Sequence, residues 1–349
     1  MSSIFIAMVK KESLHILRDT RTMLIIIFIP LALLLLFGFA ISTEVNNVRV
    51  VAVTDLHDDH TYDIFTRLSA NEYFSFEGTA AAPEVEPLLR RGEADAAIVL
   101  RHSDGRVSAQ IIVDASNTSV AKTITAYLST VLNEGIQAPI VTHTLYNPQM
   151  KSAYNFVPGI MGMIFILICA IMTSVSIVAE KETGTMDLLL VSPAKPYTII
   201  FGKLVPYFLL SCVILAITLL MTYTVLGLPL SSTVIGVTGV SLLYIILSLS
   251  IGLLVSTIVD TQVSALIVSA ILFMLPVLLL SGMIFPIDNM PSLLQWISCI
   301  IPARWFIDAI RVLMVQQSGI AYVATDIFVL TAMTVAVLTV AILKFKKSQ

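Results

Sequence analysis

The sequence predicts an α-helical polytopic membrane protein with six transmembrane helices, an amphipathic N-terminal helix and an inserted α/β domain outside the cytoplasm. Three observations predict this fold class. Of the 349 residues, 57% are hydrophobic and 12% are charged, and the mean hydropathy is +0.93, which excludes a soluble globular chain. Six stretches are apolar over the roughly 20 residues that a helix needs to cross a bilayer core. The interval at residues 43–155 instead alternates strand-like and helix-like patterns.

The apolar stretches place the membrane spans. The first, at residues 22–42, could instead be a secretory signal peptide, but its apolar run exceeds the usual length of about 7–15 residues and the segment before it is unusually long. We therefore interpret it as a retained anchor. The other five spans fall within residues 156–343. The six predicted spans are Thr22–Ser42, Phe156–Ala179, Leu204–Leu226, Val234–Val259, Thr261–Phe285 and Tyr322–Leu343.

The distribution of lysine and arginine orients the chain, because cytoplasmic segments next to membrane spans carry an excess of these residues. Six spans place residues 1–21, the segment between the second and third spans, and the tail at residues 344–349 on the same side of the membrane. All three segments are basic, so both termini are expected in the cytoplasm. Domains as long as residues 43–155 cross largely regardless of charge. The basic residues are Lys10, Lys11, Arg18, Arg21, Lys181, Lys195, Lys203, Lys344, Lys346 and Lys347.

Residues 1–21 have the pattern of an amphipathic helix, with apolar and basic residues on different faces. Such a helix lies along the inner leaflet, where it binds anionic headgroups or contacts a cytoplasmic partner. The alternative, an ordinary basic flank of the first span, explains the charges but not the apolar face. The apolar face comprises Phe5, Ile6, Val9, Ile16 and Leu17, and the basic face comprises Lys11, His15 and Arg18.

Residues 43–155 are expected to fold as a small α/β domain, because strand and helix patterns alternate along them. The cysteines lie elsewhere, so no disulfide framework is available to this domain. The predicted strands are Val48–Asp55, Ala94–Leu100 and Arg106–Asp114, the helical patterns are Glu84–Ala94 and Asn117–Tyr146, and the cysteines are Cys169, Cys212 and Cys299.

The stretch DLHDDHTYD, from Asp55 to Asp63, is a candidate metal site, since histidine and carboxylate side chains can hold a divalent ion. The same residues also suit the start of an exposed helix, where aspartate is favoured. We favour the helix start and predict no metal site.

The remaining patterns exclude several classes of function. No Ser-His-Asp, paired-cysteine or nucleic-acid signature is found. Only the last span contains a charged residue, Asp326 in its first turn, whereas proton- or ion-coupled carriers normally need charged groups within the membrane. The chain has no phosphate-binding loop, because Gly202 and Lys203 lack the upstream glycine and the following hydroxyl. If the protein transports, a partner supplies the energy.

The connector between the second and third spans, residues 180–203, is unusually polar for this chain. It lies within the stretch VAEKETGTMDLLLVSPAKPYTIIFGKLVPYF, which begins at Val178. The pattern predicts a helix from Glu180 to Leu190, which Pro193 and Pro196 then break. A stiff, partly apolar element held by two membrane helices is a surface on which a soluble motor could push. A turn at the lipid interface is the alternative.

Residues 286–311 are predicted to form a re-entrant segment, because Pro286, Pro291 and Pro302 cannot continue a spanning helix. A short helix over Ser292–Ile301 is expected near the outer surface. Broken backbone at membrane depth needs protein or water to satisfy it, which favours a position at a dimer interface or exit region. Arg304, Asp308 and Arg311 share a helical face, and either an ion pair within this face or contact with anionic headgroups explains them.

Three stretches of the chain resemble the type-2 ATP-binding-cassette exporter permeases. They occur in the order and spacing of that family, and the resemblance spans nearly the whole chain. The connector matches the family pattern E-x-E-x-G-T, then leucine, [ST]-P and a later G-K. In the connector the matching residues are Glu180, Glu182, Gly184, Thr185, Leu189, Ser192, Pro193, Gly202 and Lys203. In the N-terminal entry they are Lys11, Glu12, Arg18, Asp19 and Pro30, and in the re-entrant segment they are Ser281, Gly282, Phe285, Pro286, Met290, Pro291, Pro302 and Arg311.

This resemblance implies a transport subunit, not an enzyme, in a bacterial-type inner membrane. It implies pairing with an identical or related permease and with two ATP-binding subunits, which carry the ATP and Mg²⁺, while this chain binds no cofactor and no nucleic acid. The connector would transmit movement, with Glu180 and Glu182 orienting its helix and contacting basic groups of the motor. The second and fifth spans would line the path, with Phe165, Met172 and Phe273 as the candidate lining residues.

The size of the predicted outside domain resembles the branch of the family that exports drugs, antibiotics and lipid-like molecules. A membrane-anchored sensor that binds a ligand with this domain is the alternative, and it predicts no requirement for ATP. A secondary carrier is a third class, which the lack of charged residues in the spans disfavours.

Overall fold

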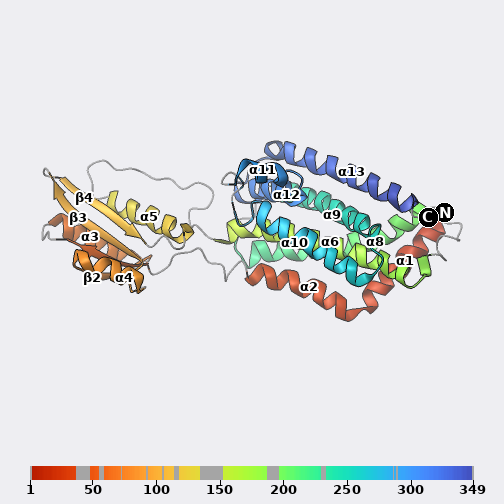
Figure 1. Cartoon of the computed structure of the whole chain (residues 1–349), viewed down its shortest axis with the longest axis horizontal. Coiled ribbons are helices and arrows are strands. Elements are labelled where there is room, and N and C mark those ends of the chain that lie inside the picture. The colour runs from red at the N-terminus through yellow and green to blue at the C-terminus, as the bar shows by residue number, and fades with distance from the viewer. Residues whose placement is uncertain are drawn as a thin grey trace. The chain divides into compact units, whose positions relative to one another are not determined.

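The computed structural model describes residues 2–36, 48–54, 59–71, 73–91, 93–103, 106–113, 118–133, 152–186, 196–228, 233–285, 287 and 290–347. The chain forms two compact units, one of Met1–Ile41 with Ser152–Gln349 and the other of Ser42–Lys151. The first is helical and the second is an α/β unit (Figure 1). The predicted insertion of an α/β domain into a helical protein is therefore confirmed.

The helical unit contains long apolar helices that run alongside one another, with shorter helices at their ends (Figure 1). The longer elements are α1 (Ser2–Arg18), α2 (Thr20–Leu35), α6 (Ser152–Glu182), α8 (Pro196–Thr224), α9 (Val234–Ser256), α10 (Gln262–Leu280) and α13 (Ala324–Lys347). The short helices α11 (Ser292–Ser298) and α12 (Pro302–Ile310) precede α13.

Five helices in the described part of the chain are long and apolar enough to cross a membrane, namely α6, α8, α9, α10 and the helix of Ile320–Phe345. They match the last five predicted spans and identify a polytopic membrane protein. In α2 the described apolar stretch is shorter, Ile26–Leu35, and residues 37–47 lie outside the description. A sixth span therefore stays a prediction. The third predicted span begins too late, because α8 starts at Pro196, and proline suits the first helical position.

Helix α6 lies at the centre of the helical unit and contacts α2, α8, α9, α10 and α12. In its most apolar window 67% of the residues are buried, against 17% in the windows of α10 and of the last span. Close packing depends on small residues: a Cβ on Gly252 of α9 would lie 2.6 Å from the backbone oxygen of Ala170 on α6. Ser174 of α6 also pairs with Ser269 of α10, with their Oγ atoms 3.1 Å apart. Small residues and hydroxyls hold helices together where lipid removes the hydrophobic drive between them.

The α/β unit has a four-stranded sheet in the order β2-β1-β3-β4, with β4 antiparallel to β3 and the other neighbours parallel. Helices α3 (Asp59–Ala70) and α5 (Thr118–Asn133) share one apolar core with the sheet, and α4 (Val85–Arg90) contributes to another. The strands are β1 (Val48–Val53), β2 (Phe74–Thr79), β3 (Ala96–Ser103) and β4 (Arg106–Val113).

The three predicted strands are present, but β2 was missed. Its six residues are short, and its pairing with β1 is irregular where the register shifts at Gly78, whose φ of 104° is in the range that favours glycine. The long helical pattern after Asn117 is described as helix only to Asn133, and its remainder lies outside the described residues.

The prolines after α10 begin new helices, in agreement with the predicted break. Pro291 directly precedes α11, and Pro302 is the first residue of α12. Helix α11 ends at Ser298, three residues before the predicted end, because the chain turns there toward Pro302. Pro286 lies outside the described residues.

Candidate functional site

Helix α6 ends at Glu182, so the helix predicted from Glu180 to Leu190 is interrupted at Thr183 and Gly184; Thr185 and Met186 are helical again, and residues 187–190 lie outside the description. Thr183 and Gly184 form a turn, and Gly184 has a φ of 71°, a left-handed conformation that glycine adopts without steric cost. The Thr185 hydroxyl donates to the backbone oxygen of Glu180 at 3.3 Å, which satisfies one of the last carbonyls of the helix. Residues 187–195 lie outside the description, and with them Leu189, Ser192 and Pro193 of the predicted connector site.

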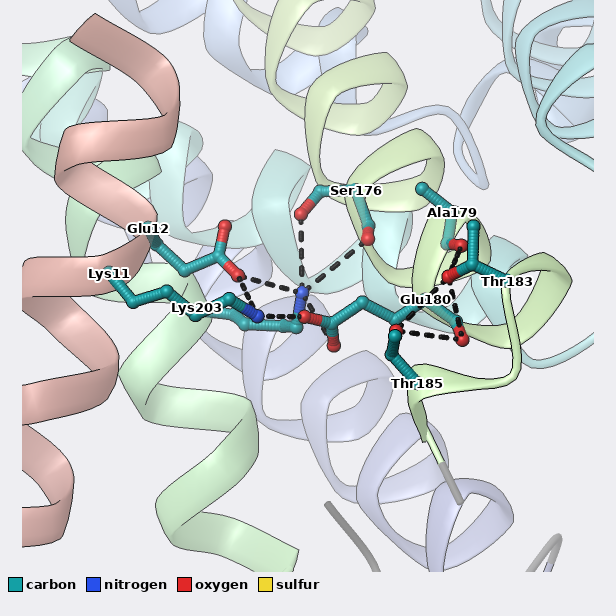
Figure 2. A network of polar contacts seen from close by, with 8 residues as sticks. All are labelled: Lys11, Glu12, Ser176, Ala179, Glu180, Thr183, Thr185 and Lys203. Carbon is teal, nitrogen blue, oxygen red and sulfur yellow. Dashed lines mark hydrogen bonds and ion pairs between the residues drawn. The ribbon is translucent and has the colours of Figure 1, made fainter. Parts of the chain in front are cut away.

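Four charged side chains from three helices meet beside this helix end, and we call Lys11, Glu12, Glu180 and Lys203 the buried charge cluster. Lys203 Nζ lies 2.9 Å from Glu180 Oε2 and 3.1 Å from Glu12 Oε1. Lys11 Nζ lies 2.6 Å from Glu180 Oε1 and 3.8 Å from Glu12 Oε1. Each ammonium group therefore contacts both carboxylates, as the dashed lines in Figure 2 show. Lys203 also donates to the hydroxyl and the backbone oxygen of Ser176, both at 3.4 Å.

Burial makes the charge balance of this cluster important. The side chains of Lys203, Glu12 and Glu180 are only 3%, 5% and 11% exposed. Two positive and two negative charges sum to zero, so the cluster as a whole is neutral, and removal of one member would leave a charge without compensation. Lys11 is more exposed. Partial burial lowers the pKa of Lys11, but its hydrogen bond and attraction to Glu180 outweigh burial and raise the pKa above the ordinary 10.5.

The next two residues after Glu180 join α6 to two further helices. Lys181 Nζ donates to the backbone oxygen of Ser256 at 2.6 Å, at the C-terminal end of α9. Glu182 Oε2 accepts from the backbone N–H and the side-chain amide of Gln262, both at 3.0 Å, at the N-terminus of α10. Each charge complements the dipole of the helix end that it meets. Three consecutive residues thus fasten the end of α6 to α1, α8, α9 and α10.

These contacts change the expected role of the two glutamates. The sequence predicted that Glu180 and Glu182 contact basic groups on a motor, but both carboxylates have partners within the chain. The prediction that they orient the helix agrees with this geometry. Lys203 was identified from the sequence as part of the G-K pair of the motif, but its ion pairs with Glu12 and Glu180 were not predicted. The motif carried no signal for these partners, which are distant in the sequence.

Helix α1 packs on α8 through a face that contains the buried Glu12. Ile6 and Leu17, which the pattern places on the apolar face expected at the inner leaflet, are each 62% exposed. Met8 lies against Gly202, where an added Cβ would be 3.0 Å from the Met8 Cβ. Arg18 lies at the exposed end of the helix. The outward face of α1 therefore mixes basic and apolar side chains.

At α12 the predicted ion pair forms, and we call Arg304, Asp308 and Arg311 the α12 charge cluster. Arg311 Nη1 lies 3.5 Å from Asp308 Oδ1, and Arg311 Nη2 donates to the backbone oxygen of Gly282 at 3.1 Å. Arg304 donates to the Ser298 hydroxyl at 2.6 Å and so joins α12 to α11. The interpretation as an ion pair is confirmed for Asp308 and Arg311.

The candidate lining residues do not share one environment. Phe165 is 1% exposed and meets Phe306 edge to face, with ring centroids 6.2 Å apart. It is a core residue in this conformation, so it does not line an open path here. Met172 and Phe273 are half-buried at the edge of the core. Tyr244 stacks on Phe306 and donates to the backbone oxygen of Gly162 at 3.1 Å, which completes this aromatic core.

A metal site finds no support in the described residues, where no three His, Cys, Asp or Glu side chains are grouped to hold an ion. Residues 55–58 of the candidate stretch lie outside the description, and α3 begins at Asp59 as the helix-start interpretation predicts.

Comparison with known proteins identifies the family. The model of the family described as ABC-2 family transporter protein matches residues 21–343. The chain belongs to this family. Its members named below are permeases, and membership implies association with an ATP-binding subunit. The match extends across both compact units, in agreement with the resemblance of the three sequence stretches.

Two of the relatives described here match almost the whole chain, and a third matches about two thirds of it. The probable multidrug ABC transporter permease YbhS of Escherichia coli K12 is 26% identical over 98% of this chain and 96% of its own length. The probable multidrug ABC transporter permease YbhR of the same organism is 28% identical over 97% of each chain. The inner membrane transport permease YhhJ, also from this organism, is 28% identical over 68% of this chain and 67% of its own.

Proposed function

We propose that this protein is the permease subunit of an ATP-driven exporter and that the end of α6 transmits movement from the ATP-binding subunits to the membrane helices. The observation that carries this proposal is the attachment of Glu180, Lys181 and Glu182 to four other helices. These three residues open the connector, so force applied to it reaches α1, α8, α9 and α10 together. A lipid-interface turn alone would not need such attachment.

The assembly that we propose has two permease subunits, identical or related, and two ATP-binding subunits on the cytoplasmic face. Each permease has six spans in the inner membrane with both termini in the cytoplasm, which places the α/β unit on the outer side. ATP and Mg²⁺ bind to the partner subunits, and this chain binds no cofactor. The basic residues near α1 and the connector support this orientation.

The substrate that we propose is a hydrophobic or amphiphilic molecule, such as a drug, an antibiotic or a lipid-like compound. The names of the relatives, two of which are probable multidrug permeases, support this class. The described spans also offer hydroxyls and apolar side chains rather than charged ligands, apart from their ends. A sensor function gains no support from either observation.

The test is a mild-detergent purification of the tagged protein from its native membranes, with mass spectrometry of the proteins that accompany it. We expect an ATPase with a phosphate-binding loop, present in amounts comparable to the permease. The Glu182→Lys variant should lose this partner or its ATP-driven export while still inserting, and Glu182→Gln should keep both. A homogeneous permease without an ATPase would refute the proposed function.

A further inference from the structure

Helix α1 contacts the helical unit through the buried charge cluster and through partly buried apolar side chains such as Met8 and Ile16. Among its described side chains, residues 5–18, Glu12 is the only one that is buried, at 4% exposure. Its large apolar side chains Ile6, Leu14 and Leu17 are exposed by 62%, 42% and 62%. Among the described side chains of α1, deep burial is therefore confined to Glu12 of the buried charge cluster.

The buried charge cluster divides into two neutral pairs. Lys11 and Glu12 belong to α1, whereas Glu180 of α6 and Lys203 of α8 belong to the bundle. If α1 left, Lys203 would keep Glu180 at 2.9 Å and both oxygens of Ser176 at 3.4 Å (Figure 2). Neither side would retain an uncompensated charge, which is the main cost of breaking a buried ion pair.

The boundary between α1 and α2 lies close in sequence to Lys11 and Glu12. Helix α1 ends at Arg18 and α2 begins at Thr20, so Asp19 alone separates them. A change of backbone angles at this junction would swing α1 relative to α2 and would break the hydrogen bonds that the Asp19 backbone makes there, from its N–H to His15 and from the Met23 N–H to its carbonyl oxygen. Element termini of this kind absorb most hinge movements.

We propose that α1 is a releasable clip, which docks on the ends of α6 and α8 through its own neutral charge pair and leaves this position when the ATP-binding subunits close. The inference rests on the proposed function, because the closing motor supplies the force. In the docked state α1 holds α6 and α8 in the observed arrangement. In the released state these two helices keep the bond between Glu180 and Lys203 and move as a unit.

Disulfide cross-linking of α1 to α8 tests the clip. The Met8→Cys/Gly202→Cys double variant, with Cys169, Cys212 and Cys299 changed to alanine, places the two Cβ atoms about 3.0 Å apart. A disulfide accepts about 3.5–4.5 Å, so a shift of a few tenths of an ångström suffices. The purified complex with its ATP-binding subunit is oxidised with and without Mg·ATP and vanadate. We expect the cross-link yield to fall severalfold in the vanadate-trapped state.

A control pair of cysteines measures whether α6 and α8 move relative to each other. Cys169 Sγ and Ser211 Oγ lie 3.2 Å apart across these helices, so Ser211→Cys with native Cys169 and alanine at the other two cysteines forms the control. Its yield should be equal in both states. An unchanged cross-link between positions 8 and 202 would overturn the clip, and so would an equal loss of both cross-links. Absence of vanadate-trapped nucleotide would refute the proposed function itself, and the clip with it.

The neutrality of the α1 pair gives a second test that needs no ATPase. Glu12→Gln leaves the cluster with one excess positive charge, whereas Lys11→Met/Glu12→Met removes a neutral pair. We therefore expect the double variant to recover at least half of the melting-temperature loss of Glu12→Gln in detergent. A double variant that is less stable than Glu12→Gln would overturn the inference.

Discussion

The buried charge cluster and the α12 charge cluster contain the same kinds of groups but differ in construction. The first joins residues that are 169 and 191 positions apart in the sequence, with three of its four side chains no more than 11% exposed. The second pairs Asp308 with Arg311 one helical turn away, and these side chains are 37% and 30% exposed. Burial and sequence distance, and not charge alone, therefore decide whether an ion pair in this fold joins separate helices or only fixes local geometry.

The physical reason is solvent. Water screens an exposed pair and can replace either partner, so such a pair contributes little to stability. A buried charge cannot exchange its partner for water. Loss of the partner therefore destabilises every helix that contacts the buried charge. The buried charge cluster can consequently transmit a displacement between helices, whereas the α12 charge cluster chiefly fixes local geometry.

The largest effect is expected for Lys203→Met. This change leaves the carboxylates of Glu12 and Glu180 with Lys11 as their only cation in the buried charge cluster, and breaking a buried pair in this way costs about 3–5 kcal/mol. We expect low abundance in membranes and a large loss of stability, measured by thermal unfolding in detergent. Lys203→Arg keeps the charge and is the control. If Lys203→Met lost no more stability than a variant of an exposed lysine, the buried charge cluster would not hold α1, α6 and α8 together.

A smaller effect on stability, with a large effect on transport, is expected for Glu182→Lys. The carboxylate accepts from the first N–H group of α10, and a lysine there would oppose the helix dipole, at a cost of about 1–2 kcal/mol. The protein should still insert, because α6 and α10 keep their other contacts, but ATP-driven export should be lost because the end of α6 no longer bonds to the N-terminus of α10. Transport of the predicted substrate class into inverted vesicles measures this. Export at the wild-type rate would contradict the transmission role.

The same contrast explains what the sequence could predict. Apolar length identified the five described spans, and local spacing identified the pair of Asp308 and Arg311, because both are properties of neighbouring residues. The junction around Lys203 depends on packing between helices that are distant in the sequence, which spacing does not encode. The turn at Gly184 interrupts the helix predicted from Glu180 for a local reason, since its left-handed backbone ends α6.

The α12 charge cluster should tolerate substitution. Arg311→Ala removes a half-exposed ion pair and one hydrogen bond to Gly282, so we expect a loss of about 1 kcal/mol or less. The measurement is thermal unfolding in detergent at low and high salt, where salt should reduce the difference from the wild type. The control is Asp308→Ala, which should behave similarly. A loss as large as that of Lys203→Met would remove the distinction between the two clusters.

A third ion pair lies in the α/β unit, where the Arg49 guanidinium lies 2.9 Å from Asp95 Oδ1 and joins β1 to the loop before β3. Burial raises the pKa of Asp95, but the hydrogen bonds and charge of Arg49 outweigh burial, so the pKa lies below the ordinary 3.8. A carboxylate with a lowered pKa stabilises the fold above about pH 4, and this contribution is lost as the pH falls through the lowered value. Asp95→Asn should therefore increase hydrogen exchange of β1 and β3 in the full-length protein slightly at pH 7, and this difference from the wild type should shrink below pH 3.8. An equal difference at both pH values would mean that the side-chain geometry of Asp95, and not its charge, stabilises the sheet.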